Sequence, residues 1–237
     1  MTSLISLVED ANLVAGANLV AEIWQRHCLI FVSPGAWRSL LDRREDLAGE
    51  ELVAGWVDRG WPLIARRHIA DEKDGLALGL PLPPDLGKRR IALLMRPEDI
   101  VATRPPLLLN DAINAAPEAW RSSLGRVITL AAQHGIQAQI FGSLLWQSIT
   151  GLVYITPSSD LDLLLPRVEA VDLPALTSGL AEIEATSPMR IDGELVRHDG
   201  AAVNWRELHL CASELLVKTA SGAEMIDRAS FIRSLPL

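Results

Sequence analysis

The chain has 237 residues, 49% of them hydrophobic, which is enough to form the core of one large domain or of two small ones. Its net charge of −8 argues against broad, non-specific binding to nucleic acid, because such binding needs a basic face that displaces counterions. No apolar run reaches the roughly 18 residues that a membrane span needs, and the N-terminus lacks the basic region of a secretory signal. We therefore expect a cytoplasmic protein that binds neither nucleic acid nor a membrane.

The cysteines and tryptophans are predicted to have structural roles. Cys28 and Cys211 lie far apart and do not have the spacing of zinc ligands, so we expect two buried thiols. The seven tryptophans are expected to serve mainly as packing residues.

The first half of the chain predicts a small α+β domain over residues 26–104. Residues 1–25 precede it as an N-terminal extension, in which residues 12–21 form a helix or a loosely attached segment. Short apolar runs predict strands, and Ser-Pro-Gly at residues 33–35 predicts a turn. The predicted strands cover residues 28–32, 61–67, 76–82 and 90–94. Two prolines make residues 104–109 the best linker candidate, because proline resists both helix and central strand.

The second half, residues 105–237, has a more regular pattern. Pro117 suits the first turn of a helix that runs to His134, with Gly135 as its C-terminal cap. A hairpin is predicted to turn at residues 199–200. The other predicted elements are strands at 136–141, 160–165, 190–196 and 201–205 and helices from 142 through 148, over 172–185 and over 206–219. The whole chain is therefore expected to have an α+β fold.

Gly142 and Ser143 stand between a predicted strand and a predicted helix. Glycine lets a phosphate approach the backbone closely, and amides at the start of a helix face an anion. By itself this pair also fits an ordinary strand-to-helix turn.

Asp160 and Asp162 alternate with leucines along a predicted strand, so both carboxylates point to the same face. Two neighbouring carboxylates repel each other and raise each other's pKa unless a cation lies between them. Hard oxygen ligands at this spacing suit Mg²⁺. The alternative is a solvated strand edge with two surface aspartates.

A third group of charges, Arg190, Asp192 and Glu194, shares one face of a later predicted strand. Either carboxylate could complete a site for two Mg²⁺ ions, which would clamp the attacking and leaving oxygens of a displacement. The alternative is a polar strand face.

This order of features resembles the DNA polymerase β-like nucleotidyltransferases, in which Gly-Ser, Asp-x-Asp on the next strand and one acidic residue on a later strand form the signature. The resemblance implies a nucleotidyltransferase-type mixed sheet flanked by helices. It also favours Asp192 over Glu194 as the third carboxylate, so that Asp160, Asp162 and Asp192 would be the catalytic metal ligands.

The segments 141–154 and 159–164 resemble more closely the malonate decarboxylase holo-acyl-carrier-protein synthases, also called phosphoribosyl-dephospho-CoA transferases. The resemblance extends to residues 192–195, 204–208 and 214–219 and to Trp61-Pro-Leu, Arg66-Arg67, Leu78-Gly-Leu-Pro81 and Pro105-Pro106-Leu. It covers nearly the whole chain from about residue 26. Cys28 departs from the pattern, since His27 is expected to be followed by Asp.

The resemblance implies an activity and its partners. Members transfer 2′-(5″-phosphoribosyl)-3′-dephospho-CoA from its triphosphate donor, triphosphoribosyl-dephospho-CoA, to a serine of the acyl-carrier subunit of malonate decarboxylase, and pyrophosphate leaves. Such chemistry needs charge stabilisation and in-line positioning, which two Mg²⁺ ions on the three aspartates would supply. Gly142 and Ser143 would hold the pyrophosphate.

Several cations are candidates for binding the donor or the carrier. Arg66 and Arg67 are expected to contribute to substrate or carrier affinity, and Lys218 is expected to point at the cleft. The other candidates are Lys88, Arg89, Arg90 and Arg206, with solvated surface cations as the alternative for all of them. Trp146 and Tyr154 could stack on adenine, although packing is favoured for Trp146.

Two other functions remain open from the sequence. The same fold could transfer AMP to a hydroxyl of a protein or small molecule, because a fold hosts many acceptors. It could also be a non-catalytic binding module, against which the intact Gly-Ser and the three carboxylates argue.

Overall fold

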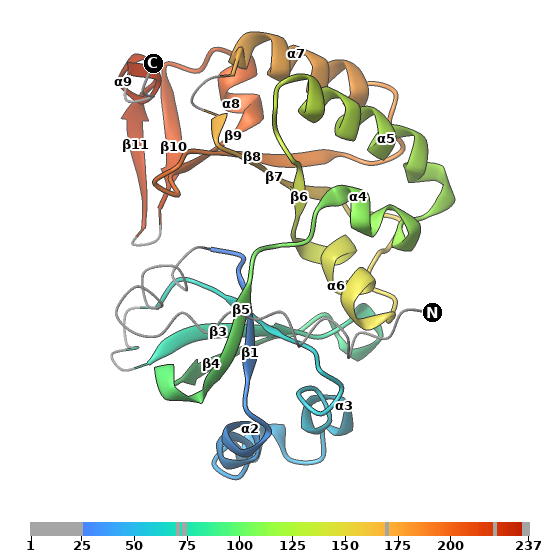
Figure 1. Cartoon of the computed structure of the whole chain (residues 1–237), viewed down its shortest axis with the longest axis vertical. Helices are drawn as coiled ribbons and strands as arrows, with labels where there is room; N and C mark the ends of the chain where they lie inside the picture. Colours follow the sequence, from blue (N-terminus) through green and yellow to red (C-terminus); the bar gives the residue numbers. More distant parts are fainter. Residues whose placement is uncertain (1–25, 70–71, 73–74, 169–170, 220–221, 234–237) are drawn as a thin grey trace. The chain divides into compact units, whose positions relative to one another are not determined.

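A computed structural model describes residues 26–69, 72, 75–168, 171–219 and 222–233 (Figure 1). The chain forms two compact units. The first runs up to Leu80 and includes Ile91–Pro105, and the second combines Pro81–Arg90 with the chain from Pro106 onward. The predicted N-terminal extension, including its possible helix, lies outside the described residues.

The first unit is built on a five-stranded sheet with the order β4-β3-β2-β1-β5. Its strands are β1 (Leu29–Val32), β2 (Leu63–Ala65), β3 (Leu76–Pro81), β4 (Arg90–Met95) and β5 (Ile100–Arg104). Its helices are α2 (Pro34–Leu41) and α3 (Glu51–Ala54), with 3₁₀ turns η2 (Glu45–Leu47) and η4 (Pro97–Asp99). The 3₁₀ turn η3 (Pro84–Leu86) lies between β3 and β4, in the segment that belongs to the second unit. The four strands predicted from apolar runs are confirmed. The fifth, β5, was missed because it ends directly at the linker prolines.

The turn predicted at residues 33–35 is wrong, because α2 begins there. Ser33 has an extended backbone, and its hydroxyl accepts a hydrogen bond from the amide of Ala36 at 3.2 Å. Pro34 occupies the first helical turn, where its missing N–H is not needed. Ser-Pro-Gly is therefore a helix start in this chain.

The second unit contains a six-stranded mixed sheet with the order β11-β10-β9-β8-β7-β6. Strands β7 and β8 are parallel, and the other neighbouring pairs are antiparallel. The strands are β6 (Gln139–Ile140), β7 (Leu161–Pro166), β8 (Ile191–Val196), β9 (Ala202–Asn204), β10 (Glu214–Lys218) and β11 (Ala223–Asp227). The helices are α4 (Leu109–Ala112), α5 (Glu118–Gln133), α6 (Gly142–Thr150), α7 (Leu173–Glu184), α8 (Trp205–His209) and α9 (Arg228–Arg233), with the 3₁₀ turn η5 (Ile113–Ala115).

The helix predicted over residues 206–219 is wrong. Helix α8 ends at His209, Cys211 has a left-handed backbone with φ 53°, and the chain then enters β10. Burial alternates along β10, where Leu215 and Val217 are buried and Leu216 is 38% exposed. An apolar Leu-Leu-Val run fits a helix and a strand equally well, so periodicity alone could not decide.

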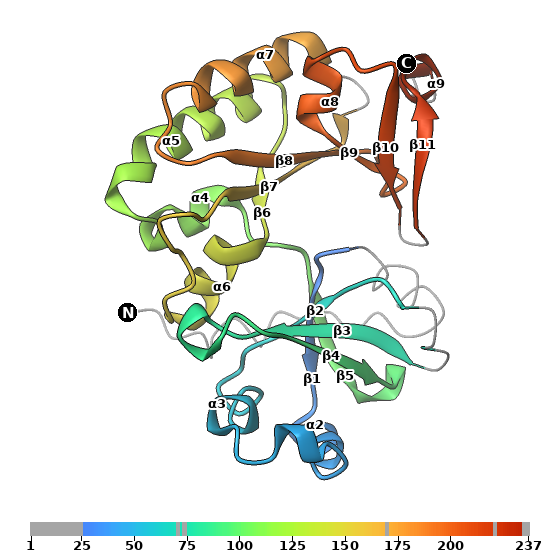
Figure 2. The ribbon, with the colours of Figure 1, turned by 180° about the vertical axis from the view of Figure 1, so that it is seen from behind.

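Helices α5 and α7 lie side by side and cover one face of β7 and β8 (Figure 2). Helix α7 connects the two parallel strands, as a crossover must. The interior between these layers is apolar, with Leu161, Leu163 and Leu165 of β7 fully buried. The expected packing role of tryptophan is confirmed for Trp37, Trp56, Trp120, Trp146 and Trp205, which are all buried.

Two further predictions bear on the cysteines and on the membrane. Both cysteines are free, but only Cys28 is buried, so the expectation of a second buried thiol is wrong for the exposed Cys211. Among the described residues, no helix has the length and apolar character required to cross a bilayer.

The strand assignment of residues 214–218 predicts opposite outcomes for two adjacent leucines. Replacing the buried Leu215 with alanine should lower the free energy of unfolding by about 2–5 kcal/mol, because it leaves a cavity. The same change at Leu216 should cost no more than about 0.5 kcal/mol, because that side chain is 38% exposed. Urea unfolding of the two variants measures both values, and equal losses would contradict the strand register.

Candidate active site

The parallel pairing of β7 with β8 places two of the predicted carboxylates side by side. Asp162 and Asp192 are register partners, and neighbouring strands lie about 4.8 Å apart. Their neighbours Leu161, Leu163 and Ile191 are fully buried on the opposite face. The alternation predicted from the sequence therefore brings both carboxylates to the same face of the sheet.

The turn at Gly142 lies directly against Asp162. Gly142 has φ +64°, and a Cβ atom at this position would lie 1.8 Å from Oδ2 of Asp162. Only glycine fits this backbone conformation and this distance. The backbone of β6 and β7 is joined here as well, because the amide of Phe141 donates to the carbonyl of Asp162 at 3.2 Å.

The start of helix α6 binds the carboxylate of Asp162. The side chain of Phe141, the residue before the helix, makes no capping hydrogen bond. The amide of Ser143 donates instead to Asp162, which thereby caps the helix from the neighbouring strand. We predicted that amides of this turn face an anion, and in the structure the anion at the Ser143 amide is Asp162.

The electrostatics of Asp162 are unfavourable despite this hydrogen bond. Burial raises its pKa to about 7, and the negative charges of Asp192 and Asp160 act in the same direction. The Ser143 amide and the charge of Arg90 lower the pKa, but they do not outweigh burial and repulsion. The surroundings of Asp162 therefore disfavour its ionised form when no cation is bound.

The two other predicted aspartates have partners of their own. Asp160, just before β7, accepts a hydrogen bond at 3.1 Å from Nε of Arg190. Asp192 accepts one at 2.8 Å from Nδ2 of Asn204. In the part of the chain that the structure describes, no three His, Cys, Asp or Glu side chains form a ready-made group of metal ligands.

Glu194 lies in a different environment from Asp192, although both are on β8. It is 4% exposed, and its Oε1 accepts a hydrogen bond at 2.7 Å from Nζ of Lys218. The positive charge of the predicted binding residue Lys218 is therefore matched with Glu194. This pairing separates the two acidic residues that the sequence could not distinguish.

The predicted binding arginines of the first unit also differ from each other. The guanidinium of Arg66 donates to both carboxylate oxygens of Glu72, to the carbonyl of Leu78 at 2.9 Å and to the carbonyl of Arg67 at 2.9 Å. The Arg66 side chain holds the pKa of Glu72 at about 2, well below its usual value. Arg66 thus makes structural contacts inside the first unit, whereas the Arg67 side chain is half-buried and has no hydrogen bond to any described residue.

The loop that follows α6 is shaped by a residue that the sequence analysis did not single out. The side-chain oxygen of Gln147 accepts hydrogen bonds from the amides of Tyr154 and Ile155 at 3.0 and 3.1 Å. Trp146 and Tyr154 are 3% and 4% exposed, and the Tyr154 hydroxyl donates to the carbonyl of Pro81. Both aromatic side chains are therefore packing residues and cannot stack on a ligand in this conformation.

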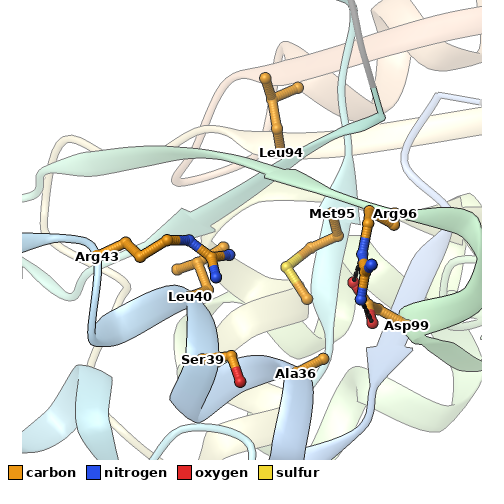
Figure 3. A pocket seen from close by; sticks show the side chains of 8 residues that line it. All are labelled: Ala36, Ser39, Leu40, Arg43, Leu94, Met95, Arg96 and Asp99. Carbon is orange, nitrogen blue, oxygen red and sulfur yellow. Dashed lines mark hydrogen bonds and ion pairs between the residues drawn. The ribbon is translucent and has the colours of Figure 1, made fainter.

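A cavity of about 500 Å³ lies in the first unit and contains none of the predicted site residues (Figure 3). Arg43 and the Arg96–Asp99 ion pair lie at its edge, and Leu40 and Met95 form its apolar wall. Arg96 is already bound by Asp99, which stays negatively charged because the Arg96 hydrogen bond lowers its pKa. Outside this ion pair, the polar side chains of the lining are those of Arg43 and Ser39.

Comparison with known proteins identifies the family of the chain. The family model of the phosphoribosyl-dephospho-CoA transferase MdcG N-terminal domain matches residues 25–106, and the model of the MdcG C-terminal domain matches residues 108–229. A phosphoribosyl-dephospho-CoA transferase of Bradyrhizobium diazoefficiens is 48% identical over 207 residues, which are 87% of this chain and 92% of the relative. Transferases of the same name from Xanthomonas campestris pv. campestris and Xanthomonas euvesicatoria pv. vesicatoria are 35% and 33% identical, each covering 86% of this chain and 95% of the relative. No solved structure matches the chain significantly.

These matches define the class of protein first: the chain is a transferase enzyme. More specifically, it belongs to the phosphoribosyl-dephospho-CoA transferase family. The predicted resemblance to this family and the predicted α+β fold are both confirmed.

The contact between Gly142 and Asp162 predicts a severe effect of one added methyl group. Gly142→Ala should abolish transfer and destabilise the protein, because the new Cβ atom would occupy the position of the Asp162 carboxylate. Gly135→Ala is the matched control: its φ is +70°, and no atom lies within 4 Å of the added Cβ. The control should lose only about 1 kcal/mol to backbone strain and keep its activity. Thermal unfolding and a transfer assay compare the two variants, and similar behaviour would contradict the close approach.

Proposed function

We propose that this enzyme transfers the 2′-(5″-phosphoribosyl)-3′-dephospho-CoA group from triphosphoribosyl-dephospho-CoA to a serine of the acyl-carrier subunit of malonate decarboxylase. Membership of the family supports the group transferred. The observation that carries the site is the pair Asp162 and Asp192, register partners on β7 and β8, in which Asp162 lies beneath the Gly142–Ser143 turn.

The residues of the site fit Mg²⁺ by the chemistry of their donors. Asp162 and Asp192 present hard carboxylate oxygens on one face of the sheet, and burial with the charges of Asp192 and Asp160 raises the pKa of Asp162 to about 7, which a bound cation would counteract. Asp160 directly precedes the same strand, and its ion pair with Arg190 is largely exposed. We propose that these three carboxylates hold two Mg²⁺ ions. When bound, the ions would neutralise charge on the phosphoryl group and on the leaving oxygens.

The proposed reaction forms one bond and breaks one. The carrier serine oxygen bonds to the α-phosphorus of the donor, the bond from that phosphorus to the bridging oxygen breaks, and pyrophosphate leaves with that oxygen. The serine proton is released. Ser143 is not the nucleophile in this scheme, because no histidine among the described residues hydrogen-bonds to its hydroxyl as a general base would.

The remaining residues are proposed to position the substrates. Gly142 and the other amides at the start of α6 would hold the pyrophosphate, as the positive end of a nine-residue helix favours an anion. Arg67 is the better of the two arginines for binding donor or carrier, because Arg66 is already engaged with Glu72. Lys218, matched with Glu194, would contribute positive charge to the same sheet. Both cysteines are free, which fits the cytoplasmic location that we propose.

One donor assay separates this proposal from its two alternatives, transfer of AMP and a non-catalytic binding module. The enzyme is offered either ATP or triphosphoribosyl-dephospho-CoA, each with carrier protein and Mg²⁺, and pyrophosphate release and carrier mass are recorded. Our proposal requires that only the CoA derivative is consumed and that the carrier gains its mass. Consumption of ATP would indicate transfer of AMP, and release of no pyrophosphate with either donor would favour a binding module.

The different partners of Asp192 and Glu194 predict different effects of removing each charge. Asp192→Asn should lower kcat by several orders of magnitude, because Asp192 is the register partner of Asp162 and is proposed to hold Mg²⁺. Glu194→Gln should keep a measurable rate, and its main effect should be on stability, because it leaves the charge of Lys218 unmatched. Initial rates of carrier modification and melting temperatures give both comparisons. The reverse pattern of rates would make Glu194 the third carboxylate.

A further inference from the structure

We infer that Asn204 is a positioning residue that holds the carboxylate of Asp192 in its working orientation. The inference rests on the proposed function, since it concerns how a carboxylate of that site is fixed. Asn204 begins a motif, Asn204-Trp205-Arg206, that neither the metal ligands nor the substrate contacts account for.

The side-chain amide of Asn204 is shared between a helix and the site. Its Oδ1 accepts a hydrogen bond from the amide of Arg206 at 3.0 Å, which makes Asn204 the N-cap of α8. Its Nδ2 donates to Oδ1 of Asp192 at 2.8 Å. A backbone amide can only donate, so the capping bond fixes which end of the Asn204 side chain faces Arg206. The NH₂ end must therefore face Asp192.

The next two residues of the motif bind the backbone beside Asp192. Nε1 of Trp205 and Nη2 of Arg206 both donate to the carbonyl of Ile191, at 3.0 and 2.8 Å. The guanidinium of Arg206 also forms an ion pair with Glu184, whose Oε1 accepts a hydrogen bond from the amide of Ile191 at 2.6 Å. Both backbone groups of the residue before Asp192 are thus held by α7 and α8.

Gly193 makes room for the indole ring of Trp205 against β8. A Cβ atom at position 193 would lie 2.9 Å from Cδ1 of Trp205, so the indole ring packs directly on the glycine. Trp205 is 1% exposed. The segments 192–194 and 204–206 therefore form one packed unit, in which Asp192 on one face of β8 and Trp205 on the other are fixed together.

A hydrogen bond to one oxygen of a carboxylate restricts its orientation and leaves the second oxygen available as a ligand. Oδ1 of Asp192 accepts from Asn204, and Oδ2 has no hydrogen bond to any described residue. Residues that hydrogen-bond to ligating groups commonly contribute about 10–100-fold to metal affinity or activity. Asn204 thus has two roles, as a helix cap and as the donor to Asp192, and these roles can be separated by substitution.

Two variants of Asn204 separate the roles. Serine is also a good N-cap, but its side chain is too short to place a donor where Nδ2 lies, whereas alanine loses both functions. We expect Asn204→Ser to keep a melting temperature close to that of the native enzyme, and Asn204→Ala to melt lower. Both should lose about 10–100-fold in kcat, with donor KM changed by less than about twofold. If kcat instead follows the melting temperature, so that the serine variant keeps native activity, Asn204 is only a helix cap.

A second measurement does not depend on activity. The chain has five asparagines, so the Asn204 side-chain NH₂ signals can be assigned in a ¹⁵N-asparagine-labelled protein by comparison with Asn204→Ala. In the native protein the two NH₂ protons should be well separated, and Asp192→Ala should move the hydrogen-bonded proton toward the position of a free amide. Signals that do not respond to Asp192→Ala would overturn the inference. If the signals respond but the native enzyme modifies no carrier, the proposed function fails while the positioning of Asp192 stands.

Discussion

The candidate site of the second unit is organised around one half-buried carboxylate, that of Asp162. Burial and two neighbouring carboxylates raise its pKa to about 7, while one helix amide and Arg90 stabilise its ionised form. Without a cation, this raised pKa means that the folded protein binds more protons than the unfolded chain between about pH 4 and pH 7. The contribution of Asp162 to stability is therefore greatest below that range and is lost as the pH rises through 7. A carboxylate whose ionised form is destabilised at neutral pH is more typical of a functional site than of a structural one.

Several unusual features of the chain follow from the need to hold this charge. Gly142 gives Asp162 the room that any other residue would fill, and α6 begins against its carboxylate. On the other side, β8 brings Asp192 into register, and the motif at residues 204–206 fixes the start of that strand. Two other carboxylates of the unit have cationic partners, Glu194 in Lys218 and Glu184 in Arg206. The contrast between these matched pairs and Asp162 supports the proposal that a cation belongs to the site.

The sequence alone predicted the parts of this arrangement that are local. The alternation of aspartate and leucine at residues 160–163 fixed the face of the strand, and Gly142-Ser143 marked the turn against it. The sequence could not show which distant residues meet these groups. Asn204 was part of a recognised motif, but its bond to Asp192 depends on the antiparallel pairing of β8 with β9. Strand β10 was missed for a similar reason, because its apolar run takes its conformation from the strands it joins, and β11 has no apolar run that would predict it. The sequence likewise could not show that Arg66 is engaged by Glu72 and by three backbone carbonyl groups.

The central claim is that the uncompensated charge of Asp162 serves group transfer. The most direct test is the intact mass of the carrier protein after incubation with donor, Mg²⁺ and the Asp162→Asn variant, beside the native enzyme. Asparagine keeps the size of the side chain and removes its charge, so the metal-free variant should be at least as stable as the native protein at pH 8. The account predicts that this folded variant leaves the carrier at its unmodified mass while the native enzyme adds the prosthetic group. A folded Asp162→Asn enzyme that modifies the carrier at a near-native rate would contradict it.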